Sequence, residues 1–187
     1  MIKRPSYLKK LIQLKDTDII KVITAVRRSG KSVLLMLYRD YLLSNGIKSD
    51  QIIYLNFEQF ELLRVRNQNE LIELLKPKLN KKQRLYLMFD EIQMVDGWQA
   101  VINGIRASYN CDIVITGSNA QMLSGELATL LSGRYVEIPI YPFSFQEFLT
   151  AKEIDPQSRE VDQAFQEYEQ FGGFPAVVLA NQEIGRA

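Results

Sequence analysis

Histidine is absent from the 187-residue sequence, and cysteine occurs once, as Cys111. Without histidine, the chain has no His-based metal site, no histidine general base and no Ser-His-Asp triad. A single cysteine excludes an internal disulfide. Any chemistry of this chain must therefore use carboxylates, lysine and arginine.

Long hydrophobic runs and an excess of charge of one sign are also absent. The apolar runs are too short to span a bilayer, and the N-terminal residues lack the pattern of a secretory signal. Basic residues number 23 and acidic residues 22, so the overall charge favours neither nucleic acid nor a membrane surface. We therefore expect a cytoplasmic globular protein that makes no membrane contact.

Short apolar runs rich in Val, Ile and aromatic residues alternate with longer stretches of helical periodicity. The runs at 19–23, 52–57, 85–89, 113–116 and 136–140 predict five strands buried on both faces of a parallel sheet. The stretches 31–44, 69–79, 98–109 and 120–131 predict crossover helices that cover the sheet. The fold class is therefore α/β, with a five-stranded parallel sheet.

The strand pattern ends after Pro142, and the remaining sequence has helical character. Residues 144–149 and 161–171 predict helices, with a break at 172–175, where two glycines and a proline occur. We expect residues 1–150 to form the core domain and residues 151–187 to form the beginning of a helical lid subdomain, which this sequence does not complete.

A phosphate-binding pattern directly follows the first predicted strand and precedes the first predicted helix. It matches GxxxxGK[ST] at every position except the first, where Ala25 replaces glycine. Backbone N–H groups of such a loop point at phosphates, and the helix dipole favours negative charge there. The candidate nucleotide-binding residues are Val26, Arg27, Arg28, Ser29, Gly30, Lys31, Ser32 and Val33.

Two side chains of this loop have specific expected roles. Lys31 reaches the β- and γ-phosphates of ATP, and the Ser32 hydroxyl binds Mg²⁺. Ala25 raises the question of strain, because a Cβ costs about 1–2 kcal/mol wherever the backbone needs a positive φ. On that hypothesis, replacing Ala25 with glycine tightens nucleotide binding.

An apolar strand ends in two adjacent acids, Asp90 and Glu91. In an open α/β sheet, ligands bind at the carboxyl ends of the strands, where this pair is expected to lie. Because successive strand residues face opposite ways, Asp90 is expected to serve the magnesium shell and Glu91 to hold the attacking water.

The fourth predicted strand ends in small polar residues, and we expect it to lie beside the strand that precedes the phosphate-binding loop. Asn119 is the first candidate, and Ser118 the second, to hydrogen-bond the γ-phosphate or the attacking water. Either residue can instead cap the helix predicted from Ala120, and the sequence does not decide between these roles.

Together these motifs resemble the AAA+ superfamily of P-loop ATPases. Residues 26–32 resemble Walker A, 87–91 Walker B and 115–119 sensor 1, and Gly133-Arg134-Tyr135 resembles the step that carries the arginine finger. Arg27-Arg28, the run 90–93, the run 116–118 and Pro142-Phe143-Ser144-Phe145 are similar to a widespread prokaryotic ATPase family. Its members usually carry a C-terminal domain of unknown function, which this sequence does not include.

The resemblance implies a Mg²⁺-dependent ATPase that couples hydrolysis to a conformational change read by a partner or by the C-terminal domain. It also implies that Arg134 acts on ATP in a homo-oligomer, and it leaves a nucleic-acid or protein client undefined. One alternative function is a P-loop kinase of a small acceptor, and another is a non-catalytic, nucleotide-dependent DNA-associated scaffold. The basic residues Lys3, Arg4, Lys9 and Lys10 are interpreted as a solvated arm.

Overall fold

Five parallel strands form the central sheet of the computed structural model, which describes residues 4–118, 131 and 133–184. The strands are β1 (Ile20–Ala25), β2 (Ile52–Asn56), β3 (Leu85–Asp90), β4 (Cys111–Ser118) and β5 (Tyr135–Ile140). Their order across the sheet is β2-β3-β4-β1-β5. The prediction of a five-stranded parallel sheet is confirmed, as is the position of β4 beside β1.

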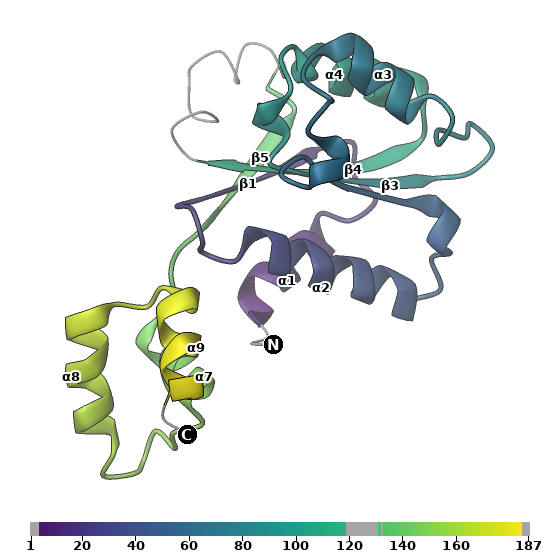
Figure 1. Ribbon diagram of the computed structural model, residues 1–187. Coiled ribbons are helices and arrows are strands. Elements are labelled where there is room, and N and C mark those ends of the chain that lie inside the picture. The colour runs from purple at the N-terminus through teal and green to yellow at the C-terminus, as the bar shows by residue number, and fades with distance from the viewer. Residues whose placement is uncertain (1–3, 119–130, 132, 185–187) are drawn as a thin grey trace.

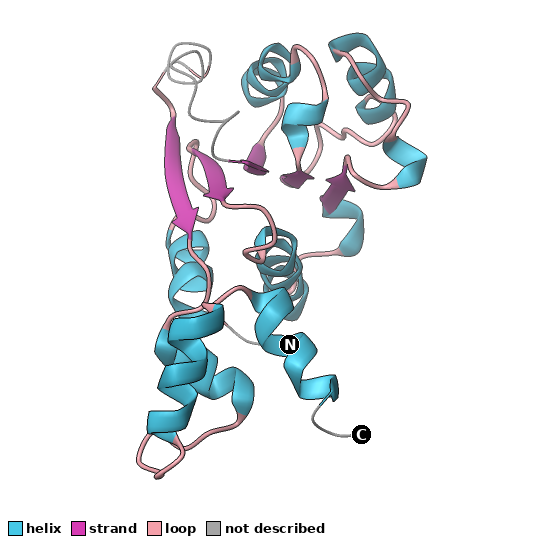
Figure 2. Cartoon of the chain, turned by 60° about the vertical axis from the view of Figure 1, so that its left-hand side comes forward, coloured by secondary structure: helices cyan, strands magenta, loops and turns pink. Residues whose placement is uncertain are grey.

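Helices cover both faces of this sheet (Figures 1 and 2). Helices α1 (Pro5–Gln13) and α2 (Lys31–Ser44) lie on one face, and α3 (Gln68–Leu75) and α4 (Trp98–Ser108) lie on the other. Three short 3₁₀ turns occur in the connections, at Ser49–Gln51, Phe60–Leu62 and Ile92–Met94. The helix predicted at 120–131 lies outside the described residues, apart from Leu131.

The alternation of strand side chains divides the core into two hydrophobic clusters, one on each face. In β1, Val22 packs in the cluster with α3 and α4, whereas Ile23 packs in the cluster with α1 and α2. In β3, Leu87 and Met88 divide in the same way. Burial on both faces explains why these strands have continuous apolar sequences.

A buried ionic network lies near the amino ends of the strands. Lys21 Nζ is 2.9 Å from Asp112 Oδ2, and both side chains are fully buried. The backbone N–H of Asp16 donates to the same oxygen at 2.7 Å, and Asp16 Oδ1 accepts from the Tyr86 hydroxyl at 2.7 Å. Burial lowers the pKa of Lys21, and the charge of Asp112 opposes that shift. Long-range polar contacts therefore tie three strands to the segment that precedes β1.

Three further helices, α7 (Phe145–Lys152), α8 (Val161–Phe171) and α9 (Pro175–Ile184), follow the sheet. They have a hydrophobic cluster of their own, in which Phe143, Phe148 and Val178 are buried. We call residues 143–184 the helical segment. The expected domain division at residues 150 and 151 passes through α7, and we propose instead that the boundary lies between β5 and α7.

The glycines of the helical segment explain how α8 turns into α9. Gly172 ends α8 with φ +72°, and α9 begins at Pro175, so the predicted break is confirmed. Gly173 packs so closely that a Cβ built there would lie 2.1 Å from the Phe143 carbonyl oxygen. A hydrogen bond also joins the two backbones, because the carbonyl oxygen of Gly173 accepts from the Phe143 N–H at 2.7 Å. Only glycine allows this approach of the two backbones.

Candidate nucleotide-binding site

The phosphate-binding loop lies at the carboxyl edge of the sheet, between β1 and α2. Gly30 precedes α2 with φ +96°, and Arg28 is also left-handed with φ +69°. Left-handed residues within a turn direct neighbouring N–H groups to one side, as an anion-binding loop requires. For Arg28 this conformation costs about 1–2 kcal/mol. The loop therefore has two left-handed residues directly before α2.

The side chains of the loop divide into an exposed and a buried set. Val26, Arg27 and Arg28 are exposed, and Arg27 makes an exposed contact of 3.4 Å with Glu58. Ser29 and Lys31 are buried. Ser32 is half-buried, and Val33 is exposed on the first turn of α2. Ser29 and Lys31 are therefore the loop side chains that are most protected from solvent.

Ala25 lies in a regular strand conformation at the end of β1, and the hypothesis of strain at this position is wrong. It pairs with Ser118 of β4 and Ile140 of β5, and it does not belong to the described residues with positive φ. Its Cβ is buried with α2. The left-handed positions that the loop needs occur at Arg28 and Gly30 instead.

Lys31 and Glu91 meet although they come from different strand ends. Lys31 Nζ lies 3.0 Å from Glu91 Oε1, and Gln93 Nε2 donates to Glu91 Oε2 at 2.5 Å. The direction of the Glu91 side chain is expected, from the sequence, to follow the alternation of residues along a strand. That reason is wrong, because β3 ends at Asp90 and Glu91 lies beyond it. Glu91 has φ +54°, and this left-handed turn sets the direction of its side chain.

Asp90 is fully buried and makes hydrogen bonds through both carboxylate oxygens. Oδ1 accepts from the Thr116 hydroxyl at 2.5 Å, and Oδ2 accepts from the Tyr54 hydroxyl at 3.2 Å. Burial and the neighbouring negative charge raise the pKa of Tyr54 to about 12, so its hydroxyl stays protonated and donates. Thr116 Oγ1 also accepts from the Glu91 N–H at 3.0 Å. One threonine thus fixes the positions of both acids.

Thr116, Tyr54 and Gln93 were not identified from the sequence as site residues. Thr116 and Gln93 do stand inside the motifs that were recognised, two residues before Ser118 and two residues after Glu91. Their proximity in sequence is the signal that could have identified them. Tyr54 contacts Asp90 from the neighbouring strand β2, and sequence spacing carries no sign of that contact.

Of the remaining predicted residues, the two that the structure describes lie at opposite edges of the sheet. Ser118 ends β4 opposite Ala25, at the edge that carries the loop. Asn119 lies outside the described residues. Arg134 is exposed just before β5, and its carbonyl accepts from Ile20 N at 3.0 Å. Arg134 therefore lies at the amino edge, roughly 16 Å along β1 from Ala25, and cannot reach the phosphates of its own loop.

The donors available at the carboxyl edge are oxygen atoms, which suit Mg²⁺. Ser32 offers a hydroxyl, and each oxygen of Asp90 keeps an acceptor position beyond its present hydrogen bond. Because Asp90 is fully buried, it fits a role toward water in the metal shell better than direct coordination. Within the described residues, no group of three or more acidic, Cys or His side chains could hold a metal by itself.

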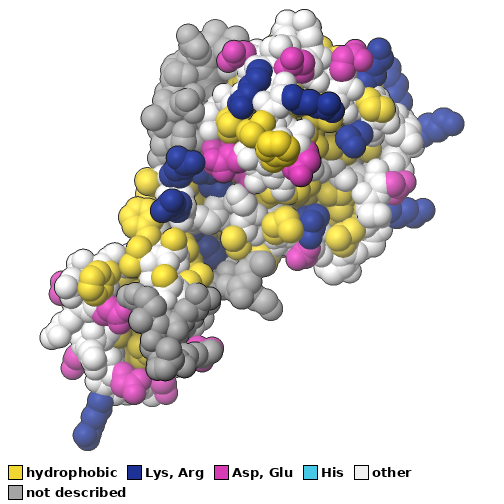
Figure 3. Space-filling view, viewed as in Figure 1, with side chains coloured by type: hydrophobic (Ala, Val, Ile, Leu, Met, Phe, Trp, Pro, Cys, Tyr) yellow, Lys and Arg dark blue, Asp and Glu magenta, His cyan; other side chains and the backbone are white. Residues whose placement is uncertain are grey.

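Two further observations concern the charged surface and the helices. On the face shown in Figure 3, the described Lys and Arg side chains are scattered among acidic and hydrophobic ones and form no continuous stripe. Among the helices of the described residues, none is both long and apolar enough to cross a membrane.

Two curated relatives share much of this sequence. An uncharacterized protein of Haemophilus influenzae is 60% identical over 98% of the chain, which covers 46% of that protein. An uncharacterized protein of Methanocaldococcus jannaschii is 39% identical over 88% of the chain, which covers 37% of that protein. The chain thus spans less than half the length of these relatives.

Solved structures share the fold at low sequence identity. The Walker-type ATPase PABY2304 of Pyrococcus abyssi has a TM-score of 0.61 at 18% identity, over 96% of this chain and 66% of that one. AMPPCP-bound DnaA from Aquifex aeolicus has a TM-score of 0.61 at 15% identity, over 95% of this chain and 58% of that one. A family model described as an AAA domain matches residues 17–149. The chain therefore belongs to the AAA-domain family, and its fold is that of a nucleotide-binding, ATPase-like core of the AAA+ superfamily.

Proposed function

We propose that this chain binds ATP with Mg²⁺ and hydrolyses it, with Lys31 and Glu91 at the centre of the site. The observation that carries the proposal is their 3.0 Å contact beside the phosphate-binding loop. A lysine in such a loop lies near the γ-phosphate, so an acid within reach of that lysine also lies near the water that attacks it. A site that only binds nucleotide needs no such acid.

The chemistry follows from the positions of the two side chains. The Lys31 ammonium and the loop N–H groups neutralise phosphate charge, and the arrival of a phosphate replaces Glu91 as the partner of Lys31. The released Glu91 carboxylate can then orient a water and accept its proton. Gln93 and Thr116 hold Glu91 through its other oxygen and its backbone N–H, so its position does not depend on Lys31 alone.

Ser32 and Asp90 are the residues that would hold Mg²⁺. Ser32 would bind it through its hydroxyl, and Asp90 would accept hydrogen bonds from water in its shell. The ion would supply positive charge that offsets the charge of the phosphate oxygens. Thr116 and Tyr54 hold Asp90 in one orientation for this purpose.

Two further proposals concern residues outside this centre. Ser118, at the edge beside the loop, and Asn119 are candidates to hydrogen-bond the γ-phosphate or the attacking water. Arg134 is too far from its own loop, so any contact with ATP must be made with a second copy of the chain. Hydrolysis would then require assembly, and the helical segment or a partner would respond to the nucleotide.

The proposal is tested by phosphate release from MgATP, with the purified chain and two variants. Glu91→Gln should still bind ATP, because it removes the carboxylate that competes for Lys31, while hydrolysis falls about 10²-fold or more. Lys31→Ala should lose ATP binding, measured by calorimetry. Glu58→Gln is a matched control at an exposed acid near the loop and should turn over normally.

Three outcomes would contradict parts of the proposal. Unchanged ATP affinity in Lys31→Ala would contradict the phosphate-binding loop. Wild-type turnover in Glu91→Gln would place water activation elsewhere. Transfer of the labelled γ-phosphate to an added acceptor, without release of phosphate, would favour a kinase.

A further inference from the structure

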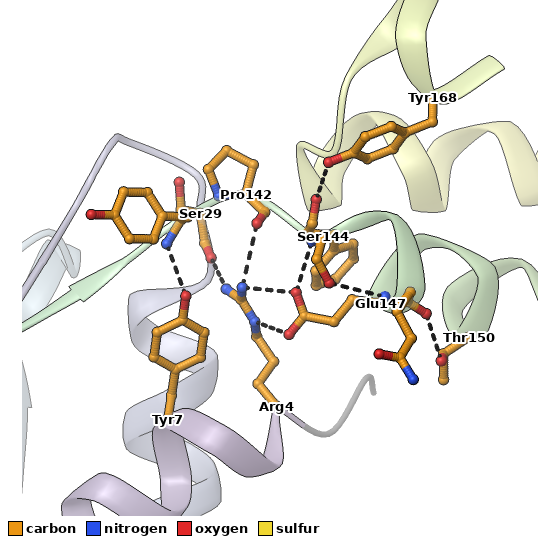
Figure 4. Close-up of polar contacts among 11 residues, drawn as sticks. Arg4, Tyr7, Ser29, Pro142, Ser144, Glu147, Thr150 and Tyr168 are labelled. Atoms are coloured by element: carbon orange, nitrogen blue, oxygen red, sulfur yellow. Dashed lines mark hydrogen bonds and ion pairs between the residues drawn. The ribbon is translucent and has the colours of Figure 1, made fainter. Parts of the chain in front are cut away.

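Arg4 is a buried arginine outside the nucleotide site, and it contacts two parts of the chain that are far from it in sequence (Figure 4). Its Nε and Nη2 atoms donate to the two carboxylate oxygens of Glu147, at 2.9 and 3.1 Å. Its Nη1 donates to the Ser29 carbonyl oxygen at 3.1 Å. Its guanidinium therefore connects the phosphate-binding loop with α7 of the helical segment. The interpretation of Arg4 as part of a solvated arm is wrong.

The surroundings of Arg4 hold its guanidinium in one place. The Tyr7 ring lies on it with a centroid distance of 4.5 Å, and the Phe143 ring lies 5.4 Å away. A third acceptor is the Pro142 carbonyl, 3.4 Å from Nη2, in the connection between β5 and α7. Arginine is suited to this position because its planar guanidinium donates in several fixed directions and also stacks on aromatic rings.

The contact with Ser29 orients a peptide group of the loop. In a planar trans peptide, the carbonyl of residue 29 and the N–H of residue 30 point to opposite sides. Because Arg4 donates to the Ser29 carbonyl, the Gly30 N–H points away from Arg4, which leaves this N–H free to face a phosphate on the other side of the peptide. Ser29 is buried, and Gly30 is left-handed, so this peptide belongs to the section that forms the anion site.

Glu147 has two roles that can be separated by mutation. It pairs with Arg4, and it also caps α7, because its Oε2 accepts from Ser144 N at 2.9 Å while its own N–H donates to Ser144 Oγ at 3.3 Å. Glutamine at this position retains the cap and removes the charge. Alanine at Ser144 weakens the cap and leaves the Arg4–Glu147 pair in place.

We propose that Arg4 is a positioning residue that holds the Ser29–Gly30 peptide in its phosphate-binding orientation, and that Glu147 of the helical segment holds Arg4 there. The position of the helical segment would thereby control the anion affinity of the loop. By reciprocity, nucleotide binding would stabilise the segment in this position. This inference rests on the proposed nucleotide site and adds a residue that touches neither nucleotide nor water.

The test measures MgADP affinity by calorimetry, KM and kcat for MgATP, and thermal stability of each variant. Arg4→Met should weaken MgADP binding about ten-fold, as expected from the loss of a charged hydrogen bond. KM should rise similarly while kcat changes little, because Arg4 acts on phosphate binding and not on the water. Arg4→Lys keeps the charge but lacks the planar set of donors, so the MgADP affinity of this variant should lie between those of wild type and Arg4→Met.

Three further variants establish whether Glu147 acts through Arg4. Glu147→Gln should weaken MgADP binding, and the double variant with Arg4→Met should bind no worse than Arg4→Met alone. Ser144→Ala should lower thermal stability and leave the affinity unchanged. Wild-type affinity in a folded Arg4→Met variant would overturn the role of Arg4. Additive effects of Arg4→Met and Glu147→Gln, or an affinity loss in Ser144→Ala as large as that in Glu147→Gln, would overturn the link to Glu147.

The result for the wild-type chain separates this inference from the proposed function. If wild type does not bind MgADP, the nucleotide site itself is wrong and the inference falls with it. If wild type binds MgADP and Arg4→Met binds it equally well, only the inference fails.

Discussion

The two edges of the sheet both bury charged groups, but they use them differently. At the amino edge, Lys21 and Asp112 are fully buried, and the contacts of Asp16 close the network. At the carboxyl edge, Lys31 pairs with Glu91, which keeps some exposure, and the loop around Lys31 leads to exposed residues. A fully enclosed pair can only support the fold, whereas a pair that reaches the surface can exchange its partner for a ligand. We therefore propose that the amino edge stabilises the fold and that the carboxyl edge carries the proposed chemistry.

Arg134 provides the strongest test of this division between the two edges, because it lies at the amino edge and yet has a proposed catalytic role. If it acts on ATP bound to a second copy, Arg134→Ala should reduce the activity of the assembled protein roughly 10³-fold or more. Affinity for ATP should stay nearly unchanged. The measurement is hydrolysis as a function of protein concentration.

Mixing two inactive variants distinguishes action between copies from a structural role. Arg134→Ala and Glu91→Gln together should recover part of the activity, because one kind of contact then combines an intact Arg134 with an intact Glu91. No recovery, despite demonstrated assembly of the two variants, would indicate that Arg134 only supports the turn before β5.

Asp112→Ala should give the largest loss of stability, because it leaves Lys21 buried without its partner. We expect a loss of about 3–5 kcal/mol, measured by urea unfolding. The matched control replaces both charges with Lys21→Met and Asp112→Leu and should recover most of the loss. At temperatures where Asp112→Ala is folded, its ATP affinity should equal that of wild type. A large change in affinity would contradict the division between the two edges.

The ion pair of Glu147 with Arg4 is expected to make the free energy of unfolding depend on pH. Burial raises the pKa of Glu147, but hydrogen bonds from Arg4 and Ser144 outweigh this effect and hold the pKa below its ordinary value of 4.5. The stabilisation is therefore present above pH 4.5 and is lost as the pH falls through the lower, folded-state pKa. The free energies of unfolding of wild type and Glu147→Gln should differ at pH 7 and converge in acid. A difference that grows in acid would contradict the sign of the shift.

Ala25→Gly is expected to have the smallest effect. Since Ala25 has an ordinary strand conformation, glycine relieves no strain and makes the unfolded chain more flexible. We expect a loss of about 0.5–1 kcal/mol in stability and no gain in nucleotide affinity. Tighter binding would restore the hypothesis of strain at this position.

The sequence predicts features that depend on neighbouring residues. Continuous apolar runs identify the five strands, and the loop at 26–32 is recognisable from its residue pattern and from its position between a strand and a helix. The direction of Glu91 could not be derived, because it depends on one left-handed residue that the sequence does not mark. Arg4 and Glu147 are 143 positions apart, so only tertiary packing joins them. Helix α1 is not predicted from the sequence, because this segment is interpreted only through its positive charges.

Gly173 makes the joint between α8 and α9 intolerant of any side chain. A Cβ there would meet the backbone of Phe143, which cannot rotate away as a side chain can. The methyl group of an alanine at this position would therefore push the α8–α9 turn away from the connector that follows β5. A change of one methyl group at Gly173 would thus disturb the packing of the helical segment, with every residue of the phosphate-binding loop left as it is.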